Sequence, residues 1–147
     1  MTEKQLQAKL ILTFGQKYPQ YRDLLFEVNN DVYSINHAAA RKAVGMVAGV
    51  SDLIFINPYN GKIIGIELKS ENSTHAQKHI HTQLNWGAKI TNAGGYYILS
   101  TNIEFIMQFI DSIIKKNDLE NAKLRIENTV FISQILEQIA VKKTVLF

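Results

Sequence analysis

Residues 50–69 constrain the fold more than any other stretch, because they have the pattern of two strands joined by a tight turn. Two apolar, β-branched runs flank Asn57-Pro58-Tyr59-Asn60-Gly61, a cluster of turn-forming residues. Side chains alternate between the two faces of a strand, so one face of the predicted hairpin is wholly apolar. That face carries Leu53, Phe55, Ile64, Ile66 and Leu68.

The opposite face carries Asp52, Glu67 and Lys69. If Pro58 to Gly61 form the loop, Asp52 lies opposite Glu67. If Asn60-Gly61 is a two-residue turn, Asp52 lies opposite Lys69, with Glu67 on the diagonal. Either register leaves two carboxylates close together, which lowers stability unless a cation such as Mg²⁺ binds both. The alternative is an exposed hairpin with solvated charges, but the grouping at one end of an apolar hairpin argues against it.

At this point the residues resemble a known family. Asp52, followed after the hairpin by Glu67-Leu68-Lys69, resembles the PD-(D/E)XK nuclease superfamily, and three further features resemble its VRR-NUC branch. These are Gly49-Val50-Ser51-Asp52-Leu53, similar to a Gly-Val-Pro-Asp-Leu stretch; Gln83-Leu84-Asn85-Trp86, similar to a Gln-x-x-Trp helix; and Gly94-Gly95-Tyr96-Tyr97, similar to a glycine and strand. The resemblance covers roughly residues 1–105, and Ser51 departs from it where the family has proline.

The resemblance implies a metal-dependent nuclease that hydrolyses phosphodiester bonds, with DNA as the expected partner and Mg²⁺ or Mn²⁺ as cofactor. Asp52, Glu67 and the backbone carbonyl of Leu68 would be the metal ligands. Lys69 would orient the attacking water, and Gln83 would point into the active site. An acid on the first helix can approach the metal in this family, which makes Glu3 a further candidate, although capping that helix is its simpler role.

Composition is compatible with this reading. The chain of 147 residues suits one domain, with 46% hydrophobic and 20% charged residues. It has no cysteine, no signal-peptide pattern and no apolar run near the ~20 residues that a membrane span needs. We therefore expect a cytoplasmic protein without membrane contact. The net charge of +3 permits a nucleic-acid partner but does not require one.

The remaining pattern predicts an α/β fold with a central mixed sheet flanked by helices, similar to restriction endonucleases. In addition to the hairpin, it predicts two strands, at 24–28 and 96–99. It also predicts five helices, at 2–14, 38–44, 74–92, 102–116 and near 131–139. Residues 1–116 would form the catalytic core, and 117–147 a helical extension of the same domain.

Basic side chains are expected to contact DNA phosphates. Arg41 and Lys42 lie in the short helix before Asp52, and Lys78, His79 and Lys89 lie in the helix that carries Gln83. Solvated surface charges are an equally acceptable reading of Arg41 and Lys42. A zinc site at His75 and His79, which are four residues apart, is a weaker alternative because no third ligand is evident.

The many apolar residues after position 117 predict a homodimer, since the core appears complete before them. The function has two alternatives to a general nuclease. One is a structure-selective endonuclease for branched DNA, of the Holliday-junction resolvase type. The other is a non-catalytic nucleic-acid-binding protein on the same scaffold, which the intact Asp52, Glu67 and Lys69 argue against.

Overall fold

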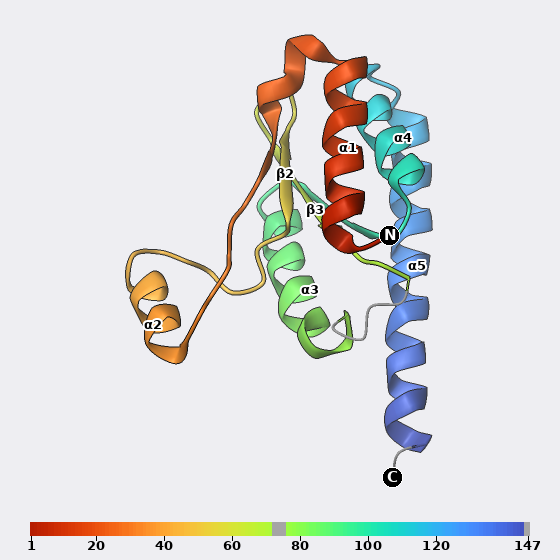
Figure 1. Ribbon diagram of the computed structural model, residues 1–147. Helices are drawn as coiled ribbons and strands as arrows, with labels where there is room; N and C mark the ends of the chain where they lie inside the picture. The colour runs from red at the N-terminus through yellow and green to blue at the C-terminus, as the bar shows by residue number, and fades with distance from the viewer. Residues whose placement is uncertain (72–75, 146–147) are drawn as a thin grey trace.

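A four-stranded mixed sheet forms the centre of the molecule. The computed structural model describes residues 1–71 and 76–145, with only the backbone of 76–78 and 142–145. The strand order is β1 (Leu25–Glu27), β2 (Leu53–Ile56), β3 (Ile63–Leu68) and β4 (Tyr96–Ser100). The pairs β1–β2 and β2–β3 are antiparallel, and β4 is parallel to β3. Helices flank this sheet (Figure 1), which confirms the predicted α/β fold.

The hairpin adopts the first of the two predicted registers. Leu53 pairs with Ile66 and Ile56 with Ile63, and the Asn57 N–H donates to the Lys62 carbonyl at 2.9 Å. The loop is therefore Pro58 to Gly61, and Gly61 adopts φ +72°, which favours glycine. The two-residue turn at Asn60-Gly61 is excluded, and continuing the register places Asp52 opposite Glu67.

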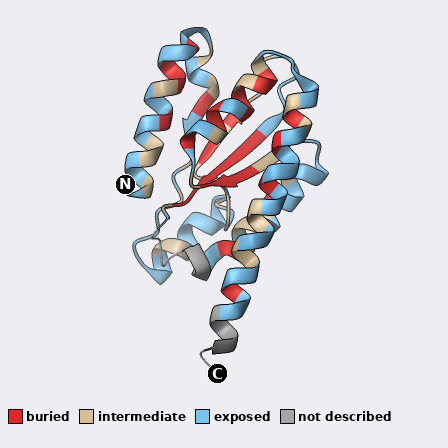
Figure 2. Ribbon diagram, turned by 90° about the vertical axis from the view of Figure 1, so that its right-hand side faces the viewer, coloured by how far each residue is buried: buried red, intermediate tan, exposed pale blue. Residues whose placement is uncertain are grey.

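One face of the sheet is covered by α1 (Glu3–Lys17) and α4 (Ile103–Ile114). The predicted capping box at Thr2 is confirmed, because Gln5 N–H donates to the Thr2 hydroxyl and the Gln5 side chain accepts from Thr2 N–H. The first core cluster lies here and contains all five apolar hairpin residues, with Leu10, Phe14, Ile106, Phe109 and Ile110 from the helices. Figure 2 shows that most of the sheet is buried, whereas two of the three residues of the edge strand β1 are exposed.

The other face packs against α3 (Ala76–Asn92) and the C-terminal half of α5 (Asp118–Val145). A second, smaller cluster forms there around Ile80, Leu99 and Ile139; partly buried side chains packed against it are Leu84, Tyr97, Phe131, Ile132, Ile135 and Leu136. The premise of the dimer prediction is therefore wrong for these C-terminal residues, because they pack against their own sheet. The homodimer itself stays a prediction.

Helix α5 is much longer than the sequence pattern predicted. Its buried stripe is interrupted by Asn121 and Asn128, two polar residues that an apolar periodicity does not reveal. The Asn128 amide accepts from the Leu99 N–H at 3.3 Å and donates to the Leu99 carbonyl at 2.8 Å. This side chain thus occupies the outer edge of β4, where a further strand would otherwise pair.

Between β1 and β2 the chain leaves the sheet as an arm, residues 29–51, that carries α2 (Ile35–Ala43). A short 3-10 helix, η1 (Pro19–Leu24), connects α1 to β1. Figure 1 shows α2 standing apart from the sheet and α5 extending past it. Within the described part of the chain, no helix combines the length and the apolar character needed to cross a bilayer.

Candidate metal centre

The centre of the candidate site is the pair formed by Asp52 and Glu67. Asp52 immediately precedes β2, and its Oδ2 accepts from the Leu68 N–H of β3 at 3.1 Å. The Asp52 backbone is fixed as well, since its carbonyl accepts from the Val28 N–H at 2.9 Å. Ser51, where the resembled family has proline, is fully buried and donates its hydroxyl to the Leu53 carbonyl at 2.8 Å. Asp52 therefore has a defined backbone position despite this departure.

Glu67 is only 2% exposed, which is unusual for a carboxylate. Its Oε1 accepts from Gln83 Nε2 at 2.8 Å and lies 3.3 Å from the Lys69 ammonium nitrogen, whose residue is 6% exposed. Its Oε2 is buried and has no hydrogen-bond partner among the described residues. One oxygen of Glu67 is thus held by Gln83 and Lys69, and the other has no donor among the described residues.

Burial, and to a lesser degree the neighbouring Asp52 carboxylate, together raise the pKa of Glu67 to about 8 against the opposing effect of Lys69. Burial also raises the pKa of Asp52, opposed chiefly by the hydrogen bond from the Leu68 N–H. Both carboxyl groups therefore hold protons more tightly than in water. This is the conflict expected of a buried acid and a half-buried acid that lie beside a single lysine.

Close packing of α3 against the sheet sets the position of Gln83. A side chain at Gly65 of β3 would have its Cβ 2.6 Å from the Trp86 ring, and one at Gly87 would lie 2.5 Å from the Tyr97 ring. These glycines allow α3 to approach the strands, and Trp86 and Tyr97 pack edge to face with centroids 6.2 Å apart. The helix is thereby held where the Gln83 amide reaches Glu67.

Two more polar atoms near this pair are buried without a partner in the part of the chain that is described. They are Gln83 Oε1 and the Tyr97 hydroxyl. Tyr97 shares the α3 side of the sheet with Glu67, and the pKa of its phenol is raised by burial and by the Glu67 and Asp52 charges. Buried polar groups normally have partners, so three unpartnered atoms together indicate a place for water or an ion.

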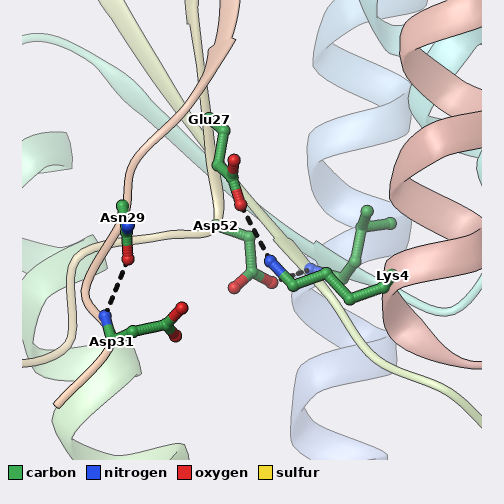
Figure 3. Close-up of polar contacts among 6 residues, drawn as sticks. Lys4, Glu27, Asn29, Asp31 and Asp52 are labelled. Atoms are coloured by element: carbon green, nitrogen blue, oxygen red, sulfur yellow. Dashed lines mark hydrogen bonds and ion pairs between the residues drawn. The ribbon is translucent and has the colours of Figure 1, made fainter. Parts of the chain in front are cut away.

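Asp52 opens into a pocket of about 380 Å³ between α1, the base of the arm and α3. Its lining consists of Lys4, Gln7, Glu27, Val28, Asn29, Asn30, Asp31, Ala48, Gly49, Val50, Asp52, His79, Thr82 and Gln83. Figure 3 shows the Lys4 amino group reaching from α1 to Glu27 beside Asp52, with a nitrogen–oxygen distance of 2.8 Å. The Glu27 hydrogen bond raises the pKa of Lys4, and the Asp31 and Asp52 carboxylates add to this.

Sequence reasoning missed Lys4, Glu27 and Asp31 as pocket residues. Lys4 is one residue from the candidate Glu3, but nothing in its helical spacing connects it with β1 or Asp52. Glu27 is the last residue of β1 and so lies beside the start of β2, as a predicted pairing of these strands would have indicated. Strand order, which the sequence did not provide, is the signal that could have found it.

The other candidates are scattered. His79 lines the pocket, whereas Lys89 is exposed on α3 outside its lining, and Arg41 and Lys42 are exposed on α2. The side chain of Lys78 lies outside the described residues. The Glu3 charge raises the pKa of Asp52, yet the described residues contain no group of three His, Cys, Asp or Glu that could hold a metal. That finding gives no support to Glu3 as a third carboxylate ligand. The predicted zinc site at His75 and His79 is not tested, because His75 lies outside the described residues.

Comparison with known proteins shows which known fold this chain resembles. No protein-family model and no curated protein matches the chain. A solved structure, a "VRR_NUC domain protein", is 21% identical with a TM-score of 0.60, covering 78% of this chain and 89% of that chain. The chain has a VRR-NUC-like fold. This likeness concerns the fold alone, and the chemistry must be argued from the carboxylate pair.

Proposed function

We propose that this protein is a metal-dependent nuclease of the PD-(D/E)XK type that hydrolyses phosphodiester bonds in DNA. The observation that carries the proposal is the pair formed by half-buried Asp52 and buried Glu67 beside Lys69, with Asp52 lining a pocket. A carboxylate pair of this kind costs stability, so a protein that keeps it has a use for it. The VRR-NUC-like fold supports a nuclease over other uses of a metal site.

The residues present fit a hard divalent cation. Mg²⁺ takes oxygen ligands and is usually bound by one or two carboxylates, with water and substrate phosphate completing its shell. Asp52 and Glu67 supply the carboxylates, and Glu67 Oε2 has no hydrogen-bond partner among the described residues. Because both pKa values are raised, binding of the metal would release protons. The Leu68 carbonyl would be the third protein ligand, with Mn²⁺ as a substitute ion.

When bound, the cation supplies Lewis acidity and lowers the pKa of a coordinated water. The chain's own residues would do the rest. The Lys69 ammonium would orient the attacking water and offset negative charge that develops on the phosphate. Gln83 holds Glu67 Oε1, which would leave Oε2 available to the cation, and so would act as a positioning residue. His79 and Lys4 line the pocket where the substrate strand would enter.

A cleavage panel tests the proposal. Full-length protein would be incubated with Mg²⁺ or Mn²⁺ and with single-stranded, duplex, flapped and four-way DNA, and with an RNA strand of matching sequence. We expect cleavage of at least one DNA substrate, abolished by EDTA. Lys69→Met should reduce the rate about 10²–10³-fold, the usual effect of losing one group that stabilises developing charge. Lys62→Met, at an exposed lysine of the hairpin turn, is the matched control.

The panel also separates the alternatives. Cleavage confined to flapped or four-way DNA would identify a structure-selective endonuclease. Binding without cleavage of any substrate, with either ion, would contradict the proposal and favour a non-catalytic nucleic-acid-binding protein. Retention of full activity by Lys69→Met would contradict the catalytic role given to that lysine.

A further inference from the structure

The arm, residues 29–51, presents side chains that the proposed active site does not use. None of the nine residues of α2, all of them described, is buried. A helix this short is not stable alone in water, although Ser34 caps its N-terminus. The arm also holds large apolar side chains in solvent; these are Val32, Tyr33, Ile35, Val44 and Val47, with Ile35 90% exposed. Such a surface indicates a binding partner.

Tyr33 is the most informative of these residues. It is 83% exposed, yet its ring has a fixed neighbour, the His37 imidazole, with centroids 5.0 Å apart and planes inclined by 30°. The Tyr33 N–H donates to His37 Nδ1 at 3.1 Å, and the His37 N–H donates to the Ser34 hydroxyl at 3.0 Å. The result is a preorganised aromatic face in water, which is the feature on which unpaired nucleobases stack.

The charged side chains of the arm indicate which class of partner it binds. The arm carries two permanently cationic side chains, Arg41 and Lys42, and one acidic side chain, Asp31, which lies at its base in the pocket lining. Both cationic side chains are exposed in the last turn of α2. A polyanion is therefore attracted, whereas a second copy of the chain would bring like charges together.

The arm is continuous with the pocket above Asp52. Its outgoing limb (Asn29 to Asp31) and returning limb (Ala48 to Val50) both line that pocket. The returning limb is anchored on α3, since Gly49 adopts φ +84° and a Cβ there would lie 2.4 Å from the Thr82 carbonyl oxygen. The outgoing limb therefore leads from the pocket at Asp31 to Tyr33 and α2.

We propose that the arm binds the nucleic acid beside the scissile phosphate, with an unpaired base stacked on Tyr33 and flanking phosphates contacted by Arg41 and Lys42. This inference rests on the proposed nuclease function and adds its substrate class, namely DNA with unpaired nucleotides next to the cut. In a fully paired duplex the bases are stacked on one another, and Tyr33 has no base to receive. The arm therefore favours single-stranded, flapped or branched DNA over plain duplex.

Binding without cleavage tests this. Fluorescence anisotropy in EDTA would compare single-stranded, flapped and duplex oligonucleotides of one sequence, using full-length protein. Tyr33→Ala should weaken binding of the first two about tenfold and of duplex less than about twofold. Tyr33→Phe, which keeps the ring, should restore binding, and Tyr59→Ala, at an exposed tyrosine of the hairpin turn, should have no such selective effect. Arg41→Ser should weaken the binding of all substrates alike. It should also reduce the dependence of the binding constant on salt concentration by the amount expected for about one phosphate contact.

Equal affinity of Tyr33→Ala and wild type for flapped DNA would overturn the inference, as would an equal loss on every substrate. A wild-type dimer in light scattering that Ile35→Asp converts to monomer would also overturn it and assign the arm to a contact between copies. Failure of the nuclease proposal would give a result distinct from these. Tyr33-dependent binding would persist, while the wild type would cleave no substrate.

Discussion

The two faces of the sheet use the same strands in opposite ways. On the side of α1 and α4, every hairpin side chain is apolar and packs into one continuous cluster that includes the edge-to-face pair of Phe14 and Phe55. On the side of α3 and α5, the same strands present Glu67 and Lys69 among apolar neighbours, with three buried polar atoms unpartnered in the described chain. Stability resides on the first face, and the second carries strain that a bound ligand can relieve.

The largest expected effect lies on the stable face. Phe55→Ala should lower the free energy of unfolding by about 3–5 kcal/mol, because it leaves a cavity in a close-packed core. Ile54→Ala, at the half-buried neighbour on the other face, should cost less than half as much. Urea denaturation of both variants measures the difference. Equal losses would contradict the assignment of stability to one face.

The Glu67 carboxyl should oppose stability as the pH rises. Its pKa is about 8 in the folded protein and near 4.5 when unfolded, so the folded state binds the proton more tightly. Its contribution is complete below about pH 4.5 and is lost as the pH rises through about 8. Unfolding of metal-free wild type in EDTA should show stability falling by more than about 1 kcal/mol between pH 5 and pH 8. Glu67→Gln should show a clearly shallower slope, and an unchanged slope would refute the shift.

Asn128 closes the edge of β4 on the α5 side. Asn128→Ala should lower the free energy of unfolding by about 1–3 kcal/mol, because the Leu99 N–H and carbonyl lose their side-chain partner. Asn36→Ala, at an exposed asparagine of α2, is a control expected to have almost no effect. Equal stability of the two variants in urea would show that water replaces the Asn128 amide without cost.

The smallest expected change in stability comes from replacing one of two adjacent tyrosines, Tyr96 and Tyr97, which lie on opposite faces of β4. The Tyr97 hydroxyl is buried and unpartnered among the described residues, so Tyr97→Phe should leave stability unchanged or raise it by up to about 1 kcal/mol. Tyr96 packs against Phe109 and the Arg125 guanidinium, and Tyr96→Phe should give no gain. A loss above 1 kcal/mol in metal-free Tyr97→Phe would mean that its hydroxyl has a partner in solution.

The hairpin was predictable because local signals agree there. Turn residues at Asn57 to Gly61 and strict alternation along both strands predicted that Asp52 and Glu67 share one face, and the longer loop proved correct. The depth of the site was not predictable. Burial of Glu67 depends on α3 lying close to the sheet. Gly65 and Gly87 permit this approach, but their role cannot be recognised from the sequence before the positions of Trp86 and Tyr97 are known.

The C-terminal helix shows the opposite case. Two of its inward positions are Asn121 and Asn128, so the apolar repeat was recognised only near Phe131 to Ile139. The apolar side chains of this segment were therefore expected to lack a core of their own, which led to the dimer prediction. Exposed apolar side chains lie on the arm and also on α5, at Leu119, Ile126, Val130 and Val141. The short helix of the arm was predicted, but its position away from the sheet depends on chain geometry rather than on local sequence.

The central claim is that the Asp52–Glu67 pair is completed by a divalent cation. Thermal unfolding of the full-length protein at pH 7.5 across a Mg²⁺ or Mn²⁺ titration tests it most directly, since a ligand that binds only the folded state raises stability by about 2.7 kcal/mol at one hundred times its Kd. The account predicts a rising, saturable melting temperature for wild type and for the exposed-acid control Glu71→Gln, and none for Glu67→Gln. A wild-type melting temperature unaffected by either ion, or an equal rise in Glu67→Gln, would contradict it.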